Sequence, residues 1–397
     1  MATRKLSELP EATHPFAGTE SIPLVQEGET RQVALANLLG EAAIATWLAP
    51  YRVSSDARPS FNRDALNQAI LDAVAQKRPP VVLLPPGRIP LDGPVILRRG
   101  IRVNGASAAD LPIGTELFLV DGSNTVVIQN EGWPTGERSW DCAELAYLRV
   151  NGNRAGNPDG GSGIAIRSMG TTSEIRQVVV RNCGRYGFEF SGTQDPATLR
   201  SCTVEDNGAG GVRLGGEGVL LITALSGHGG GPLVVVEGGG SPSVTLVGVS
   251  ANGHEPIIKI SEGQPQVTIL GGRAEAPAAG GNLVRIEKGD AGVQILGLHH
   301  HSFGWLVSDG SKDSGLAASG NLSGIALYNN PVRLADDSGP GFGLSTARNE
   351  RREPLILVGE GTPSSKLEAP NGSLYLRSDG AAGSTLYVRE AGRWTVK

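Results

Sequence analysis

Aromatic and acidic residues gather in one irregular stretch of the sequence, residues 129–142. The stretch carries Trp133, Glu137, Trp140 and Asp141. Indole faces beside carboxylates suit the faces and hydroxyl groups of a sugar ring, and long loops carry binding residues more often than tight turns do. The stretch is therefore a candidate carbohydrate-binding site. The alternative, which the sequence supports equally, is that both tryptophans cover an open end of the hydrophobic core.

A second polar loop follows one strand later, at residues 153–159. It carries Arg154 and Asp159, a cation and a carboxylate that can hydrogen-bond to sugar hydroxyl groups. Tyr186 lies in a corner after Cys183 and supplies a further aromatic ring. We expect these residues to line the same groove as the aromatic stretch.

Five acidic residues in the middle of the chain are candidates for sugar hydrolysis: Glu174, Glu189, Asp195, Glu205 and Asp206. Hydrolysis normally needs two carboxyl groups, about 5 Å apart for retention of configuration or roughly 6.5–9.5 Å apart for inversion. Elimination needs a base such as lysine, and between the first repeat and residue 310 the chain offers only Lys259 and Lys288. The catalytic residues of such an enzyme stay unassigned.

Histidine and cysteine give no clear metal site. Residues 299–301 are three histidines in or beside a strand, where neighbours point to opposite faces, so one chain cannot direct all three at one ion. In a trimer, one histidine from each chain could meet on the axis. Cys142, Cys183 and Cys202 have no CxxC spacing, and no GxxxxGK[ST] motif is present. We expect no metal and no cofactor.

Composition sets the class of fold that must position these residues. Glycine accounts for 57 of 397 residues and proline for 25, while aromatic residues make up 5%. Glycine costs about 1 kcal/mol per helical position relative to alanine, which excludes a mostly helical protein. The 39% of apolar residues argues against disorder, and no Gly-X-Y period indicates collagen. Many short strands joined by many turns remain.

Charge and hydropathy exclude several classes of partner. The net charge of −5 leaves no basic footprint for nucleic acid. The longest apolar run, near residues 232–236, is far too short to span a bilayer, so we expect no membrane insertion. The N-terminus leads straight into charged residues, without the apolar segment of a secretory signal.

An internal repeat organises residues 140 to about 335. Four segments align on Gly184, Gly208, Gly229 and Gly253, in steps of 24, 21 and 24 residues, and each is followed by a short apolar strand. A period of this size without intervening helices predicts a solenoid of strands, a parallel β-helix. Alignment on the glycines places Cys183, Asn207, His228 and Asn252 in one column, which we interpret as a structural ladder.

The repeat register gives the charged residues a structural interpretation. It places Glu189 opposite Arg213 and Arg181 opposite Glu205, one rung apart. Neighbouring rungs lie about 4.8 Å apart, so both would be cross-strand ion pairs. Arg176 and Arg200 also stack, as solvated decoration or, less favoured, as a site for an acidic glycan.

The two ends of the chain predict smaller elements. Strands are expected at residues 21–26 and 30–35, and a helix from an N-cap at Asn62 to Ala75. That helix would bury Leu66, Ala69, Ile70, Ala73 and Val74 on one face. Residues 372–397 predict a hairpin and a third strand, a meander too small to be stable alone.

Three stretches resemble parts of bacteriophage tail spike and fibre proteins. Residues 4–38, with KLSELP and TESIPLVQ, resemble their N-terminal segment. Residues 62–105, with VVLLPPGRIPLDGPVIL, resemble the entry to the pectate-lyase-like right-handed β-helix. Residues 371–397, with GSLYLRSDG and TLYVRE, are similar to a tail found on many phage structural proteins.

The resemblance implies an all-β, right-handed, single-stranded parallel β-helix that assembles as a homotrimeric spike. It divides the chain into a virion-attachment anchor (1–50), a capping helix and entry (51–105), a shaft (106–340) and a C-terminal strand tip or trimerisation segment (341–397). Residues 1–45 would bind a baseplate, capsid or neck protein. The protein would be made in the bacterial cytoplasm and carried on the virion.

The same resemblance implies binding of host surface polysaccharide, with endo-acting hydrolysis or elimination left open. The opposing interpretation is a structural or receptor-binding fibre without catalysis. The glycine-rich second half of the repeat, which lacks the aromatic density of a deep sugar cleft, favours that interpretation. A free extracellular lyase is disfavoured by the virion-type ends and the missing signal.

Overall fold

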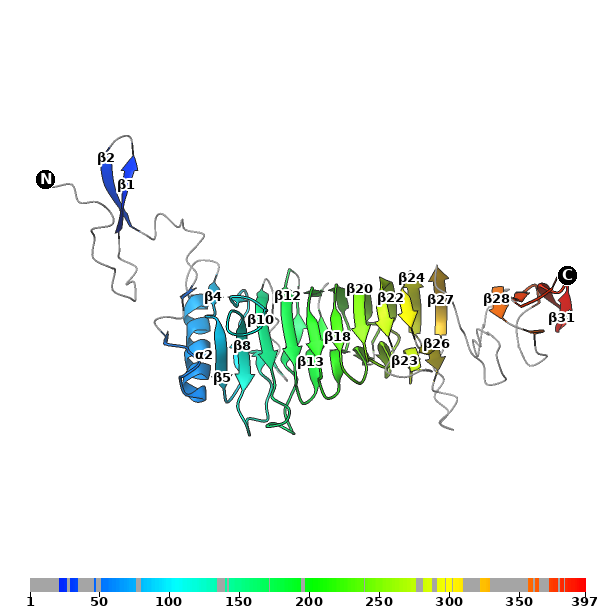
Figure 1. The fold of residues 1–397 in the computed structure, drawn as a ribbon, viewed down its shortest axis with the longest axis horizontal. Coiled ribbons are helices and arrows are strands. Elements are labelled where there is room, and N and C mark those ends of the chain that lie inside the picture. The colour runs from blue at the N-terminus through cyan, green and yellow to red at the C-terminus, as the bar shows by residue number, and fades with distance from the viewer. Residues whose placement is uncertain are drawn as a thin grey trace.

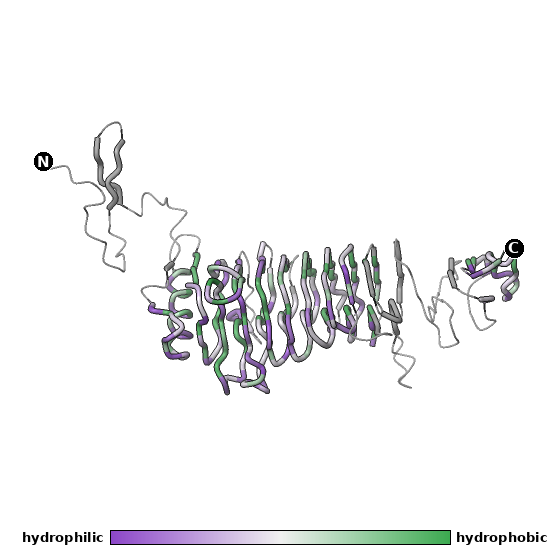
Figure 2. Tube along the Cα trace, in the orientation of Figure 1, coloured by the Kyte–Doolittle hydropathy of each residue, from purple (hydrophilic) through white to green (hydrophobic). Residues whose placement is uncertain are grey.

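Short stretches of alternating apolar and polar residues become the rungs of a parallel β-solenoid. In β13 (Tyr186–Thr193), Phe188 and Phe190 are fully buried, while Glu189 between them points away from the core. Each residue of a strand meets its counterpart one rung later, as Phe188 meets Val212. Stacking makes the apolar interior continuous along the molecule (Figure 2).

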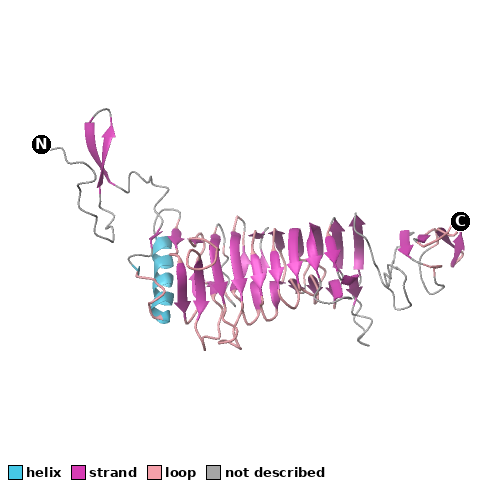
Figure 3. Cartoon of the chain, in the orientation of Figure 1, coloured by secondary structure: helices cyan, strands magenta, loops and turns pink. Residues whose placement is uncertain are grey.

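The computed structural model describes the residues that follow. They are 21–26, 29–34, 46–47, 51–75, 80–133, 140, 143–170, 172–193, 197–238, 240–275, 281–287, 291–296, 298–301, 303–309, 322–328, 356–359, 361–363, 371–377, 379–381 and 383–397. Within them the solenoid has three faces, which we call A, B and C (Figures 1 and 3).

Faces A and B form one sheet because four long strands bend across both. Face A contains β3 (Thr46–Trp47), β4 (Val81–Leu83), β7 (Arg102–Asn104), the first halves of β10 (Glu144–Asn151) and β12 (Glu174–Arg181), β14 (Ala197–Arg200), β17 (Val219–Thr223), the first halves of β20 (Ser243–Asn252) and β22 (Gln266–Glu275), β24 (Ala291–Leu296) and β27 (Leu322–Tyr328). Face B contains β5 (Gly87–Leu91), β8 (Thr115–Leu119), the second halves of β10 and β12, β15 (Thr203–Glu205), β18 (Ser226–His228), the second halves of β20 and β22, and β25 (His299–His301).

Face C forms a second sheet in the described chain. It runs through β6 (Val95–Leu97), β9 (Ile128–Asn130), β11 (Ile164–Met169), β13, β16 (Gly210–Gly215), β19 (Val234–Glu237), β21 (Ile258–Ile260), β23 (Gly281–Ile286) and β26 (Phe303–Asp309). All the pairings within the three faces are parallel, so the predicted parallel solenoid is confirmed.

Columns of left-handed residues bend the chain at the corners. Between faces A and B the column has φ of 50–65° and consists of Tyr147, Gln177, Ser201, Ala224, Gly248 and Gly271. Between faces B and C it contains Asn182, Asp206, Gly229 and Gly253. L-residues with side chains adopt this conformation at a cost, and Gly and Asn adopt it most readily. The corners, rather than the strands, set the solenoid period.

Alignment of the sequence on its glycines places Gly184 and Gly208 at equivalent positions of the solenoid, but it misplaces Gly229 relative to them. Gly184 and Gly208 lie two residues after the left-handed corner, where a Cβ on either would come within about 2 Å of a carbonyl oxygen of the previous rung. Gly229 itself occupies the corner, so the step to it is 23 residues from Asp206. His228 therefore lies opposite Glu205 and Asn252, outside the column of Asn207. Asn207 accepts a hydrogen bond from the Cys183 amide at 3.0 Å.

Helix α2 (Pro59–Ala75) covers the N-terminal end of the solenoid (Figure 1). It starts three residues before the expected N-cap, with proline at its first position. Asn62 is instead fully buried within the helix and donates to the carbonyl oxygens of Ser54 and Pro90. The predicted apolar face is buried except at Val74, which stays 39% exposed.

Two small sheets lie outside the solenoid. β1 (Ser21–Gln26) and β2 (Glu29–Ala34) form the expected antiparallel hairpin. Near the C-terminus, β28 (Ile356–Gly359) pairs in parallel with β29 (Leu374–Arg377), which continues antiparallel into β30 (Leu386–Glu390) and β31 (Arg393–Val396). Tyr375 and Tyr387 pack edge to face on the buried side of this sheet, with ring centroids 6.1 Å apart.

Candidate functional site

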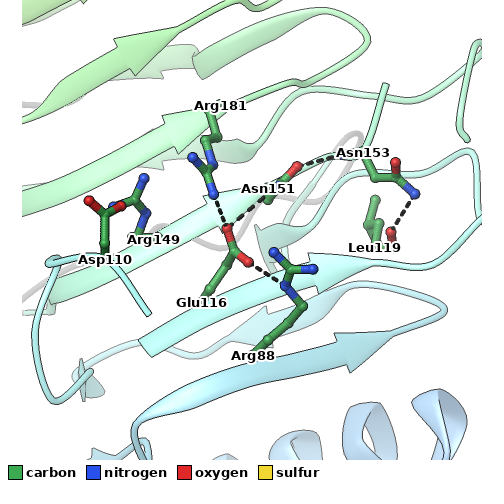
Figure 4. Close-up of polar contacts among 8 residues, drawn as sticks. All are labelled: Arg88, Asp110, Glu116, Leu119, Arg149, Asn151, Asn153 and Arg181. Atoms are coloured by element: carbon green, nitrogen blue, oxygen red, sulfur yellow. Dashed lines mark hydrogen bonds and ion pairs between the residues drawn. The ribbon is translucent and has the colours of Figure 1, made fainter. Parts of the chain in front are cut away.

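The first rungs of face B carry a group of charged side chains that we call the Glu116 cluster. Its members are Arg88, Asp110, Glu116, Arg149, Asn151 and Arg181 (Figure 4). The local sequence explains its position, because Leu117 and Leu119 of β8 point into the core and leave Glu116 on the opposite side. Register then places Arg88 and Arg149 on either side of Glu116.

Glu116 is fully buried at the centre of this cluster. Its carboxylate accepts hydrogen bonds from Arg88 Nε at 2.6 Å, Arg181 Nη2 at 2.7 Å and Asn151 Nδ2 at 3.3 Å. Burial alone would raise the pKa of Glu116, but the hydrogen bonds from Arg181, Arg88 and Asn151 outweigh it and lower the pKa. The group is a fixed anion, and a general acid would need the opposite shift.

Arg149 is the most enclosed cation of the cluster. Its side chain is 9% exposed, and its Nη1 pairs with the carboxylate of Asp110, which is 89% exposed on the preceding loop. The Nε atoms of Arg149 and Arg181 are both buried without a hydrogen-bond partner. The cluster therefore holds donors that the described chain leaves unused.

Two polar loops adjoin the cluster where faces B and C meet. The Asn153 amide N–H donates to Asn151 Oδ1 at 3.0 Å, and Asn153 Nδ2 donates to Leu119 O and to Asp121 Oδ1. The Asn124 amide donates to Asn157 Oδ1 across the two loops. These bonds fix the loops at residues 120–127 and 152–163 beside the cluster.

The aromatic stretch lies elsewhere. Trp140 is fully buried in the solenoid core, where it bridges to Met169, and its Nε1 has no hydrogen-bond partner. Trp133 is half-buried in the turn after β9. Glu137 and Asp141 lie outside the described residues.

The second polar loop does not lie beside the two tryptophans, contrary to the expectation that they line one groove. Arg154 and Asp159 are exposed in the loop after β10, while the tryptophan stretch precedes that strand, so the two loops lie at opposite ends of β10. Tyr186 is close to the second loop, since its amide N–H donates to Ser162 Oγ at 3.3 Å. Its ring is largely buried, with Arg185 5.7 Å from the ring centroid.

The candidate carboxylates mostly serve cross-rung pairing. Glu189 lies opposite Arg213 and pairs with it at 3.0 Å, as predicted. Arg181 lies opposite Glu205 as predicted, but its guanidinium pairs with Glu116. The stacked Arg176 and Arg200 both pair with Glu174, which fits decoration of the solenoid better than a site for an anion. Asp195 lies outside the described residues, and Asp206 occupies a corner.

Cysteine and metal chemistry find no support in the described chain. Cys183 and Cys202 are buried free thiols, and burial raises the pKa of each to about 12. Among the described residues, no three His, Cys, Asp or Glu side chains are grouped as metal ligands. Of the described helices, none is long and apolar enough to cross a membrane.

Sequence reasoning missed the core of the cluster. Arg88, Asp110, Glu116 and Arg149 precede or open the repeat, where no glycine alignment was available. A signal did exist: Glu116 is the single charged residue in the strand Thr115–Leu119, which marks an acid that needs partners once it is buried.

Comparison with known proteins identifies the fold. No family model matches the chain, and none of the curated proteins matches it. Among solved structures, the A-module of the Azotobacter vinelandii mannuronan C-5 epimerase AlgE6 is similar at a TM-score of 0.50 and 19% identity, covering 64% of this chain and 75% of that chain. The likeness establishes the parallel β-solenoid.

Phage proteins recur among the similar structures. ORF18 of Geobacillus virus E2 matches at a TM-score of 0.49 and 13% identity, over 85% of this chain and 73% of that chain. Tailspike gp49 of Acinetobacter baumannii bacteriophage Fri1, described as a capsular polysaccharide depolymerase, matches at 0.43 and 12%, over 80% and 67%. Phage tailspikes are thus among the solved structures that the chain resembles, as the sequence resemblance led us to expect.

Proposed function

We propose that the chain is a phage spike or fibre whose solenoid binds host surface polysaccharide through the Glu116 cluster and the loops beside it. The observation that carries this proposal is a set of three arginines on one outer face, of which Arg88 and Arg181 are held by the buried carboxylate of Glu116 and Arg149 pairs with Asp110. A rigid array of guanidinium donors suits hydroxyl-rich and acidic sugars, because little conformational freedom is lost when they bind. Arg154 and Asp159 extend the same surface.

Binding without cleavage is the form of this proposal that the geometry favours. Glu116 is held ionised between arginines, and Glu189 is paired with Arg213. Protonation of a leaving group needs a raised pKa, and the pKa of Glu116 is lowered, so Glu116 is not poised to act as a general acid. Depolymerisation remains the second candidate because the tailspike resemblance implies it.

One experiment distinguishes binding without cleavage from depolymerisation. The full chain is incubated with capsule and lipopolysaccharide extracted from candidate host bacteria. Binding is followed by calorimetry, and cleavage by new reducing ends or by absorbance of unsaturated sugars. We expect binding without release, and the Arg88→Ala variant, at a half-exposed position, should bind at least threefold more weakly. Glu287→Gln, which alters the half-buried ion pair with Lys259 on face C, is the control at a distant site.

Release of oligosaccharides would contradict the binding-only form and establish the depolymerase. Absence of binding to every extract, by a chain that is folded, would reject the proposed function.

The assembly around this activity is also a proposal. We assign residues 1–50 to virion attachment, 51–105 to the cap and entry, 106–340 to the shaft and 341–397 to the tip or trimerisation segment. Three chains would form the spike, with residues 1–45 bound to a baseplate, capsid or neck protein. The support is the sequence resemblance at both ends of the chain.

A further inference from the structure

The side chain of Asp110 occupies the position on Arg149 that an acidic ligand would take. Arg149 is nine-tenths buried, and its Nη1 pairs with the Asp110 carboxylate, while its Nε is buried without a partner. Asp110 is almost fully exposed on a loop. Among the described residues, Asp110 is the carboxylate partner of this enclosed guanidinium, and it can leave without disturbing the core.

The cost of exchanging that partner is small. Asp110 itself gains little from the pair, because its carboxylate is 89% exposed and water solvates it once it leaves Arg149. Leaving Arg149 without any anion costs more, because a buried charge needs a compensating partner. A second carboxylate that replaced Asp110 would restore the pair and add its own contacts.

Local charge also favours an anion at this position. The cluster holds three cations, Arg88, Arg149 and Arg181, against two anions, Asp110 and Glu116. Glu116 is fully buried and committed to Arg88 and Arg181, so it does not contact a ligand. Displacement of Asp110 would leave an outer surface with an excess of two positive charges around Arg149.

The loop that carries Asp110 adds apolar surface. Leu111 and Ile113 are 37% and 68% exposed beside Asp110. Phe118, outward on β8, stacks with the Arg88 guanidinium at 4.8 Å from its ring centroid. Apolar side chains beside a guanidinium suit the faces of a sugar ring that bears a carboxylate.

We propose that the Glu116 cluster binds the carboxylate of an acidic sugar residue through Arg149, and that Asp110 is an intramolecular competitor that this carboxylate displaces. This inference rests on the proposed function and names the chemical class of the glycan. A carboxylate is favoured over a sulfate or phosphate because a carboxylate already fits Arg149 in the free protein.

The test uses the full chain and three polymers at 150 mM salt. Polygalacturonate supplies carboxylates, its carboxyl-reduced form is the same polymer without them, and dextran sulfate is an unrelated polyanion. Asp110→Asn removes the competitor without removing bulk. It should bind polygalacturonate two- to fivefold more tightly than the unmodified chain, and neither should bind the reduced polymer. Glu287→Gln removes one negative charge from a different face and should match the unmodified chain.

A second readout reports on Arg149 directly. Asp110→Asn should lower the melting temperature of the free protein, and polygalacturonate should restore it, because the buried guanidinium regains an anion. If Asp110 has a purely structural role, the substitution lowers the melting temperature and polygalacturonate does not restore it.

Three results would overturn the inference: equal binding of the reduced polymer, preference for dextran sulfate, or no gain in polygalacturonate binding on Asp110→Asn. Each leaves the proposed function standing, since binding to extracted host polysaccharide decides that separately.

Discussion

At the scale of single residues, one buried carboxylate organises a whole surface. Glu116 joins Arg88, 28 residues before it in the sequence, to Arg181, 65 residues after it. Each arginine has five N–H donors, and Glu116 accepts only some of them. The buried anion therefore acts as a positioning group that turns flexible guanidinium groups into a fixed array.

Removal of one arginine should expose the dependence of Glu116 on its partners. Arg181→Ala leaves a fully buried carboxylate with fewer donors and should cost about 3–5 kcal/mol of unfolding free energy. Because the pKa of Glu116 is lowered in the folded chain, its contribution is present above the unfolded pKa and is lost as pH falls through the folded value. Loss of Arg181 should raise that pKa, so acid unfolding should begin at a higher pH.

The measurement is urea unfolding at pH 7, 5 and 4, with Arg273→Ala as control. Arg273 pairs with Glu275 on the exposed surface, so its replacement by alanine should lower the unfolding free energy by less than about 1 kcal/mol. Equal losses in the two variants would show that Glu116 does not depend on Arg181.

A buried histidine should make the solenoid sensitive to mild acid. His254 is 3% exposed, its Nδ1 hydrogen-bonds to Gly231 O at 3.0 Å, and its Nε2 has no partner. Burial lowers its pKa below 6.5, opposed by the hydrogen bond to Gly231 and by Asp206 and supported by His228. The unfolded chain therefore takes up a proton before the folded chain does, and stability is lost as pH falls below about 6.5.

His254→Gln should flatten this dependence between pH 7.5 and 5.5, where the unmodified chain should lose up to about 1.4 kcal/mol per pH unit. Thermal melts at each pH provide the measurement. His228→Gln, at an exposed site on face B, removes only a minor cause of the lowered pKa of His254 and should weaken the dependence less than His254→Gln does. Equal flattening by both variants would mean that His254 is not its source.

At the scale of elements, the strands were predictable and the corners only in part. Alternation in stretches such as Gly187–Phe190 and Gly211–Leu214 identified strands that stack as expected. The corners were harder, because both aspartate at 206 and glycine at 229 occupy the corner with positive φ, at 50° and 127°. Alignment on glycine alone therefore displaced His228 by two positions.

The candidate site was less predictable than the fold. Trp140 is a core residue because its indole fills the interior next to Met169, and sequence cannot distinguish that from an exposed sugar platform. The Glu116 cluster depends on contacts between side chains several rungs apart, and only the complete register brings those together.

One corner allows backbone strain to be tested without a steric clash. Gly248 has φ of 65°, and a Cβ there would meet nothing within 4 Å. Gly248→Val should therefore destabilise the chain through backbone conformation alone, by about 1–3 kcal/mol. Gly248→Asn should cost clearly less, since asparagine adopts this conformation more readily. Denaturant midpoints measure the stability of both variants. Similar losses of stability would mean that side-chain bulk, and not the φ angle, causes the destabilisation.

At the scale of the whole molecule, the stack of parallel strands carries the continuous core, and helix α2 covers one end of it (Figure 1). The helix buries Leu66 and Ile70 against the N-terminal end of the core, which shields the edge of the first rung. Assembly is then expected to use the segments outside the stack.

Light scattering tests that expectation. The full chain should have three times its 41.1 kDa mass, and a chain lacking residues 1–45 should stay trimeric and folded but fail to enter particles. A monomeric full chain would reject the spike assembly. Incorporation of the shortened chain would reject the anchor.

The left-handed corners also set how the gene for such a protein can change in length. Successive corners between faces B and C are separated by 24, 23 and 24 residues. Deletion or duplication of a few codons within a strand would move the next corner out of its column, whereas duplication of one full coil would keep every corner in its column. Length variation is therefore confined to surface loops, such as residues 105–114 and 152–163, or to whole coils. Related solenoids of different length should differ by whole coils, while the loops that bind ligands vary independently of the strand stack.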